Sequence, residues 1–134
     1  MYAREIMTRE VITVNPDDTV RQLARVLTEG GISGAPVLDA DRNVVGIVSE
    51  ADVVSKRGSL VKDVMGRRVV AVEEDDTVEK VCCVLSDHSI NRAPVLRNGE
   101  LVGIITRTDV VRAIAAGSLN TDLTPTSDAQ TAPA

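Results

Sequence analysis

The sequence predicts a mixed α/β (α+β) fold made of two copies of one strand–helix–strand–strand–helix repeat. Residues 5–38 align with 63–96 at 15 identities in 34 positions, and residues 44–54 align with 101–111 at 6 in 11. Within each copy, apolar residues recur first with strand spacing and then with helix spacing. A repeat of about 50 residues with three strands cannot cover both faces of its own sheet. The two copies are therefore expected to pack together as one folding unit.

Two boundaries divide the chain on sequence grounds. Residues 1–58 form the first copy and residues 59–116 form the second, and the loops after Leu38 and Leu96 differ by one residue, as surface turns tolerate. From residue 117 to 134 the composition becomes polar and rich in Pro, Thr and Ala. This composition predicts a disordered tail.

Each copy opens with a short helical turn, predicted at residues 4–7 and at 61–65. A strand is predicted next, at residues 11–14 and again at 69–72, where apolar residues are concentrated between polar flanks. An acidic turn with the shared sequence DDT then leads toward a helix.

The first long helix of each copy is predicted to begin after Thr19 or Thr77, because threonine caps helix N-termini well. Gln22 lies three residues after Thr19, which is the spacing of a capping box, and Gly30 with Gly31 predicts the end of that helix. The apolar positions of the two helices correspond and share one face; they are Val20, Leu23, Ala24 and Leu27, then Val78, Val81, Cys82 and Leu85.

A hairpin and a second helix complete each copy. The sequence APVL, at 35–38 and 93–96, starts the hairpin, and Asn98-Gly99 is a strong two-residue turn signal. The second strand of the hairpin runs into a helix that is expected to begin at Ser49 in one copy and Thr106 in the other.

The junction of that strand and helix carries the sequence GIVSEAD at 46–52 and GIITRTD at 103–109. One interpretation is an ordinary helix cap, in which the hydroxyl accepts an N–H bond and the acid favours the positive helix end. The other is a ligand site, because amides at a helix start bind phosphate and a carboxylate can accept both hydroxyls of a ribose. Gly46 and Gly103 predict close approach of another backbone or of a ligand to the strand.

Composition excludes several classes of function. The chain has no basic stripe, no apolar run of about 20 residues and no secretory leader, so we expect a cytoplasmic protein that binds neither nucleic acid nor membrane. Cys82 and Cys83 are adjacent in a predicted helix and cannot pair, and Cys82 is expected to pack as a small apolar residue. The single histidine, His88, is expected to cap a helix C-terminus, and no metal cluster or catalytic triad can be assembled.

Residues 3–116 resemble a pair of cystathionine beta-synthase (CBS) domains, also called a Bateman module. The resemblance rests on DDTV, ISGAPV and GIVSEAD in the first copy, and on DDTV, INRAPV and GIITRTD in the second. It implies pseudo-twofold symmetry and up to two clefts between the copies. It also implies adenosine-containing ligands such as AMP, ADP, ATP, S-adenosylmethionine or cyclic dinucleotides.

The resemblance further implies which residues would bind such a ligand. The acids would hold ribose hydroxyls, the hydroxyl residues would lie near phosphate or ribose, and aliphatic residues would hold the adenine, because Tyr2 is the only aromatic residue. Arginines in the second copy, where the first copy has Gly34 and Glu50, favour that copy for phosphate. The expected ligand-binding residues are Ile12, Thr13, Ile32, Ser49, Asp52, Val70, Ala71, Ile90, Arg92, Pro94, Thr106, Arg107 and Asp109.

We therefore expect a stand-alone regulatory module that senses an adenine nucleotide (AMP, ADP or ATP) through a change of packing, and that is not an enzyme. No obligatory cofactor is expected, while a homodimer formed through helices and an unknown effector protein are. One alternative is a ligand-free dimerisation or interaction scaffold, and another is binding of S-adenosylmethionine or a cyclic dinucleotide. An enzyme using Cys82 or Cys83 would need a neighbour that stabilises a thiolate.

Overall fold

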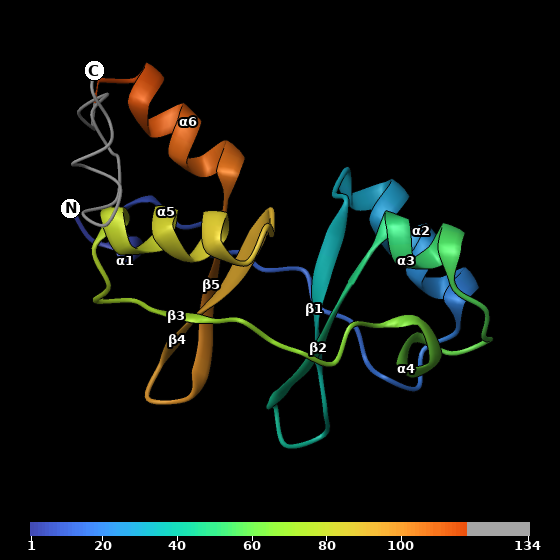
Figure 1. Ribbon diagram of the computed structural model, residues 1–134. Coiled ribbons are helices and arrows are strands. Elements are labelled where there is room, and N and C mark those ends of the chain that lie inside the picture. Colours follow the sequence, from blue (N-terminus) through green and yellow to red (C-terminus); the bar gives the residue numbers. More distant parts are fainter. Residues whose placement is uncertain (118–134) are drawn as a thin grey trace. The chain divides into compact units, whose positions relative to one another are not determined.

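The computed structural model describes residues 1–117, and the remainder of the expected tail lies outside the described residues. Along this part of the chain the second copy has the predicted order of elements, whereas the first copy lacks its first strand (Figure 1). In chain order the elements are α1 (Ala3–Ile6), α2 (Val20–Gly30), β1 (Gly34–Leu38), β2 (Val44–Ser49), α3 (Glu50–Ser55), α4 (Val61–Val64), β3 (Val72–Glu73), α5 (Val78–Asp87), β4 (Arg92–Arg97), β5 (Glu100–Thr106) and α6 (Arg107–Ala115).

The chain folds into two compact units that divide it differently from the sequence repeats. One unit contains residues 1–10 and 70–98 together with the described chain from residue 102 onward, and the other contains 11–69 with 99–101. The helical turn of each copy thus packs on the body of the other copy. Ala3 in α1 is fully buried in the core of the first unit.

The unit containing residues 11–69 is built on the antiparallel pair β1 and β2, with a register irregularity after Val37. Leu23 and Leu27 of α2 pack into its core. Val61 and Val64 of α4 are buried in the same core. The complete set of buried core residues is Val14, Leu23, Leu27, Val37, Val48, Val61, Val64 and Met65.

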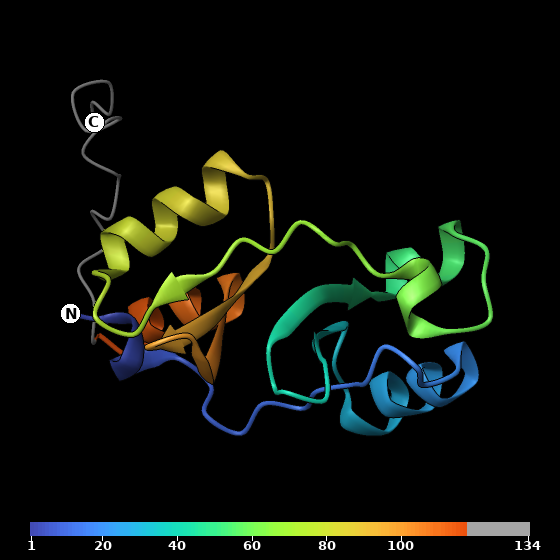
Figure 2. The same ribbon diagram turned by 90° about the horizontal axis from the view of Figure 1, so that it is seen from below.

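The other unit is built on three strands in the order β3-β4-β5, with β3 parallel to β4. Figure 2 shows α1, in blue, beside α6, in orange, within this unit. Asn98 and Gly99 have φ values of 50° and 83°, so the turn predicted between β4 and β5 is confirmed. The buried core residues are Ala3, Met7, Val72, Val81, Leu85, Ala93, Val95 and Ile105.

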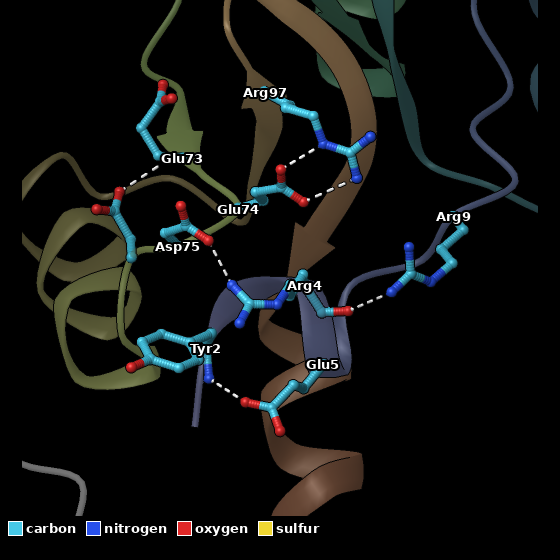
Figure 3. Close-up of polar contacts among 9 residues, drawn as sticks. Tyr2, Arg4, Glu5, Arg9, Glu73, Glu74, Asp75 and Arg97 are labelled. Carbon is cyan, nitrogen blue, oxygen red and sulfur yellow. Dashed lines mark hydrogen bonds and ion pairs between the residues drawn. The ribbon is translucent and has the colours of Figure 1, made fainter.

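Polar contacts hold the α1 segment on its unit (Figure 3). Arg4 forms an ion pair with Asp75, and Arg9 donates to the Arg4 carbonyl oxygen at 2.9 Å. Nearby, Arg97 pairs with Glu74, and its hydrogen bond holds the pKa of that carboxyl below its usual range. Of these three contacts, only the Arg4–Asp75 pair joins the α1 segment to the rest of its unit. Because exposed ion pairs contribute little to stability, the burial of apolar residues such as Ala3 anchors the segment.

The α4 segment is held in the same way as α1. Lys62 pairs with Asp17 at 3.1 Å, and Arg67 donates to the Lys62 carbonyl oxygen at 3.1 Å. These residues occupy the positions that correspond in the repeat to Arg4, Asp75 and Arg9. The duplication therefore preserved the packing of the turn and also the ionic contacts at its edge.

The helix caps predicted from sequence are confirmed. Thr19 and Gln22 form a reciprocal capping box, and the Thr77 hydroxyl accepts the Lys80 amide hydrogen at 3.2 Å. Gly31, at φ 62°, ends α2 in the left-handed conformation that glycine adopts readily.

Two sequence expectations are wrong in detail. Residues 11–14 form no strand, because only Val14 pairs there, in a parallel bridge to Val37. The strand predicted at 69–72 is limited to β3, Val72–Glu73. The chain passes from one unit to the other just before residue 11 and just before residue 70, so little of either segment lies beside a neighbouring strand. Ala24 is exposed instead of joining the apolar stripe, and Val26 packs against the core in its place.

The duplicated glycines serve close approach of backbone to backbone. A Cβ atom on Gly103 would lie 2.5 Å from Met7 Sδ and 3.0 Å from the Thr8 carbonyl oxygen. On Gly46 it would lie 2.6 Å from Met65 Sδ and 2.9 Å from the carbonyl oxygen of the next residue. The sequence left open whether another backbone segment or a ligand approaches these glycines. Among the described residues it is a backbone segment.

We predict that Gly103→Ala lowers the free energy of unfolding by about 1–3 kcal/mol, because the added methyl group overpacks the contact with Met7 and Thr8. Gly66→Ala is the control, since its Cβ would meet nothing closer than the Ile47 carbonyl oxygen at 3.5 Å. Chemical denaturation of both variants measures the difference. Equal stability of the two would contradict the packing explanation.

Candidate functional site

The corner between β5 and α6 is a helix cap that holds a buried acid. The Thr106 amide donates to Asp109 Oδ2 at 2.9 Å, and the Asp109 amide donates to Thr106 Oγ1 at 3.0 Å. Both halves of a capping box are present, which confirms the capping interpretation of this motif. Asp109 is only 7% exposed, and it is the one charged residue among the described residues that is classed as buried. A cap alone does not require such burial.

A third contact on Asp109 comes from the segment that follows α1. Thr8 Oγ1 lies 3.1 Å from Asp109 Oδ1 and 3.4 Å from Oδ2, so the hydroxyl donates to the carboxylate. Arg112 Nη1 lies 3.7 Å from Oδ1, and its side chain is mostly exposed. Asp109 is therefore fixed by one backbone amide and one hydroxyl, with a cation at the edge.

The corner between β2 and α3 has the same backbone arrangement with different partners. The Ser49 amide and hydroxyl both donate to Asp52 Oδ2, at 2.9 and 3.0 Å. Lys56 Nζ, one helical turn later, lies 2.8 Å from Oδ1. Partial burial raises the pKa of Asp52, but the hydrogen bonds from Lys56 and Ser49 outweigh it and hold the pKa below the usual range.

Counting acceptor positions separates the two acids. A carboxylate offers about four lone-pair positions. Asp109 uses two of them on Thr8 and Thr106, and the Arg112 guanidinium, 3.7 Å from Oδ1, is too far away for a hydrogen bond. Two positions remain, which is the number that a vicinal diol needs. Asp52 uses three on Ser49 and Lys56. The second-copy acid therefore has more capacity for a ligand.

The arginine expected inside the second motif contacts backbone. Arg107 Nε donates to the Ile90 carbonyl oxygen at 3.1 Å, and Nη2 lies 3.5 Å from the Leu85 carbonyl oxygen. His88 is the C-cap residue of α5, and its Nδ1 lies 3.0 Å from the Val84 carbonyl oxygen, as expected for a capping residue. The C-terminal end of α5 is thus surrounded by groups that complement its carbonyls.

The remaining predicted residues divide between the two units. Ile12 and Thr13 are exposed and Ile32 is half-buried, in the unit that holds Ser49 and Asp52. The unit that holds Thr106 and Asp109 contains the others, of which all but Pro94 are half-buried; they are Val70, Ala71, Ile90, Arg92 and Pro94. Pro94 is fully buried in β4.

Sequence reasoning missed two residues that contact the acids, Thr8 and Lys56. Thr8 lies 101 positions from Asp109, so no local pattern connects them. The repeat offered a weak signal, since Thr8 corresponds to Gly66 and Lys56 to Ala113. Lys56 could have been found from its i, i+4 spacing to Asp52.

Cys82 lacks the surroundings of a nucleophile. Burial raises the pKa of the Cys82 thiol, and the nearby Glu79 carboxylate raises it further. Among residues 1–117, no three His, Cys, Asp or Glu side chains are grouped so that they could hold a metal ion. In the same part of the chain no helix is both long and apolar enough to cross a bilayer.

Comparison with family models identifies the family. The model described as CBS domain matches residues 3–58 and again residues 61–116. These two matches cover most of the chain, so the protein belongs to the CBS domain family.

Curated relatives share this region as part of longer proteins. An uncharacterized protein of Methanocaldococcus jannaschii is 34% identical over 83% of this chain and 38% of its own length. An inosine-5′-monophosphate dehydrogenase of Korarchaeum cryptofilum is 39% identical over 81% of this chain, but over only 23% of its own length. The protein YlbB of Bacillus subtilis is 32% identical, and the match covers 80% of this chain and 78% of YlbB. The similarity to the dehydrogenase is thus confined to a minor part of that enzyme.

Solved structures share the fold. CBSX2 in complex with AMP matches with a TM-score of 0.82 at 27% identity, covering 88% of this chain and 98% of its own. The CBS domain pair of protein MJ0100, in complex with 5′-methylthioadenosine and S-adenosyl-L-methionine, also has a TM-score of 0.82, at 24% identity, covering 87% of this chain and 98% of its own. The predicted mixed α/β fold of a CBS domain pair is confirmed.

We predict that Lys56→Ala raises the pKa of Asp52, because the variant loses the closest cation while the partial burial remains. A carboxyl whose pKa is lowered by folding stabilises the fold above its unfolded pKa of about 3.9, and that contribution is lost as the pH falls through the folded value. The variant should therefore lose its stabilisation at higher pH than the wild type.

Carboxyl NMR titration of Asp52 measures the pKa directly, and unfolding between pH 2 and 6 measures its effect on stability. Lys80→Ala is the matched control, since its ammonium group pairs with Asp76 instead. An Asp52 titration that is the same in wild type and in Lys56→Ala would contradict the assignment.

Proposed function

We propose that this protein is a regulatory module that binds an adenosine-containing nucleotide, AMP, ADP or ATP, with Asp109 accepting the ribose hydroxyls. The observation that carries the proposal is the buried carboxylate with two acceptor positions left beside the start of α6. The similarity to CBSX2, whose structure contains AMP, supports the same class of ligand. The module would act in the cytoplasm and needs no obligatory cofactor.

The surroundings of Asp109 suggest how the rest of the ligand is held. The Arg107 and Asp109 amides at the start of α6 are already taken by the Asn91 carbonyl oxygen and by Thr106 Oγ1. A phosphate would therefore depend on Arg92 and Arg107, which supply positive charge on the same unit. Arg107 would have to exchange its carbonyl contacts for a phosphate. The half-buried aliphatic residues Val70, Ala71 and Ile90 suit the flat face of an adenine.

The corner at Asp52 is proposed as the weaker of two sites, together with Ser49, Ile12, Thr13 and Ile32. Lys56 competes there with any hydroxyl for Asp52 Oδ1. Glu50 begins α3 and adds negative charge, which opposes phosphate.

We propose a regulatory role without catalysis. The raised pKa of Cys82 disfavours a thiolate at neutral pH. A ligand can shift the equilibrium between two packing states only by its difference in affinity for them. The output would therefore pass to an effector protein through a surface that changes on binding.

We predict that Asp109→Asn weakens AMP binding at least ten-fold, because loss of a charged hydrogen-bonding partner costs about 1.5–3 kcal/mol. Asp52→Asn should weaken it less. Asparagine keeps an acceptor oxygen for the cap, so unfolding free energy should fall by no more than about 1 kcal/mol. Isothermal titration calorimetry with AMP, ATP and S-adenosylmethionine measures the affinities.

Equal AMP affinity in wild type and in both variants would remove the acids from the site. Binding of S-adenosylmethionine but not AMP would keep the site and change the ligand. If wild-type protein binds none of the three, a ligand-free dimerisation scaffold becomes the better interpretation.

A specific surface favours dimerisation, which we propose as part of the function. The helices α5 and α6 border a groove of about 170 Å³ lined by Cys82, Leu85, Ser86, Arg107, Val110 and Val111. Val111 is 62% exposed, and its counterpart in the first copy, Val54, is 87% exposed. Repetition of an exposed valine on both second helices suits a second copy of the chain.

We predict that Val111→Glu converts a dimer into a monomer, because a charge in an apolar interface is poorly solvated. Light scattering coupled to size-exclusion chromatography measures the molar mass. Ala40→Glu, which adds the same charge in the exposed β1–β2 turn, is the control. A dimer that persists in Val111→Glu would exclude this groove as the interface.

A further inference from the structure

We propose that Thr8 is a positioning residue that orients the Asp109 carboxylate for a vicinal diol, and that residues 1–9 are thereby part of the second-copy ligand site. This inference rests on the proposed function. Thr8 lies far from Asp109 in the sequence, and its hydroxyl donates to the acid at 3.1 Å.

The backbone of Thr8 is fixed independently of its hydroxyl. Its amide donates to the Ile104 carbonyl oxygen at 2.8 Å, and its own carbonyl oxygen accepts the Ile104 amide hydrogen at 2.9 Å. The absence of a side chain at Gly103 allows this close approach. The hydroxyl is therefore presented to Asp109 from a rigid position.

The first copy shows that this backbone pairing does not need the hydroxyl. Gly66 corresponds to Thr8 and makes the same two hydrogen bonds to Ile47, at 2.8 and 3.0 Å. The acid of that copy, Asp52, takes its extra hydrogen bond from Lys56 instead. Glycine is therefore sufficient for the backbone pairing, and the contact that threonine adds is its hydrogen bond to Asp109.

The hydroxyl determines what the acid can still accept. The amide of Thr106 fixes Asp109 Oδ2, and Thr8 fixes Oδ1, so the plane of the carboxylate cannot turn freely. Thr8 is a neutral donor, and Arg112, the cation beside this acid, stays 3.7 Å from Oδ1. A lysine in direct contact would occupy an acceptor position, as Lys56 does on Asp52. Two oriented acceptor positions then remain for the two hydroxyls of a ribose.

The experiment compares AMP with 2′-deoxy-AMP, which lacks one hydroxyl of the diol. Wild-type protein should prefer AMP by about ten-fold, because a buried acceptor loses a partner when the hydroxyl is absent. Thr8→Val removes the hydroxyl while keeping the branched shape, and this preference should fall to about two-fold. Thr8→Ser restores the donor and should restore most of the preference.

Thr28→Val is the matched control, since it removes a threonine hydroxyl that donates to the Ala24 carbonyl oxygen in α2. It should leave the preference for AMP unchanged. Thr8 is itself exposed, so its substitution creates no buried cavity, and thermal unfolding verifies that the variant is folded.

The ratio of affinities separates the possible failures. If wild-type protein binds both nucleotides equally, the assignment of Asp109 to the ribose fails, and this inference fails with it. If wild type discriminates and Thr8→Val discriminates as strongly, only the role of Thr8 is overturned. A variant that loses the same factor for both nucleotides would show a merely structural effect, and would also overturn it.

Discussion

A backbone-to-backbone contact at a glycine shapes both compact units. In each, the residues after a short helical turn run against the middle of a strand, at Gly103 or Gly46, where a Cβ atom would lie under 3 Å from a methionine sulfur. Because interiors are close-packed, even one methyl group at such a place must displace something. Both copies have glycine at this position, and a side chain there would push the turn away from the strand.

This contact also determines where the acids lie. The strand that contains the glycine ends three residues later at the capping hydroxyl, Ser49 or Thr106, and the acid follows in the first turn of the helix. The segment packed on the glycine therefore lies beside the acid, near enough for Thr8 to donate to Asp109. The close contact at the glycine and the hydrogen bond from Thr8 to Asp109 therefore follow from the same packing of this segment on the strand.

Much of the fold could be predicted because its signals are local. Threonine caps, a glycine stop and an Asn-Gly turn each act within a few residues, and helices and hairpins began and ended where those signals lay. The strand expected at 11–14 was wrong because apolar spacing cannot tell whether a neighbouring strand is present. The exposure of Ala24 has a similar cause, since the breadth of a buried helix face depends on what packs against it.

The two corners were predictable from their motif, but the partners of their acids were not. Spacing placed Asp52 and Asp109 in the first turn of a capped helix, whereas Thr8, a partner of Asp109, comes from the other end of the chain and cannot be read from any window of sequence. Arg107, whose charge suggested phosphate, contacts backbone carbonyls, because a guanidinium group finds acceptors wherever helix ends expose them. The sequence shows that a charged side chain is present, whereas the group that it contacts depends on its neighbours in the fold.

The two corners between strand and helix differ because the two copies differ at the positions that contact the acids. Positions that close the core, such as the glycines and the capping residues, are the same in both copies or differ conservatively. Positions that contact only the acids differ between the copies. Thr8 has a hydroxyl group where the second copy has Gly66, and Lys56 has an ammonium group where the second copy has Ala113. Two acids in one backbone setting thus differ in how many acceptor positions they leave open and in how closely a cation approaches them. Two corners with similar local backbone geometry can in this way differ in their capacity for one ligand.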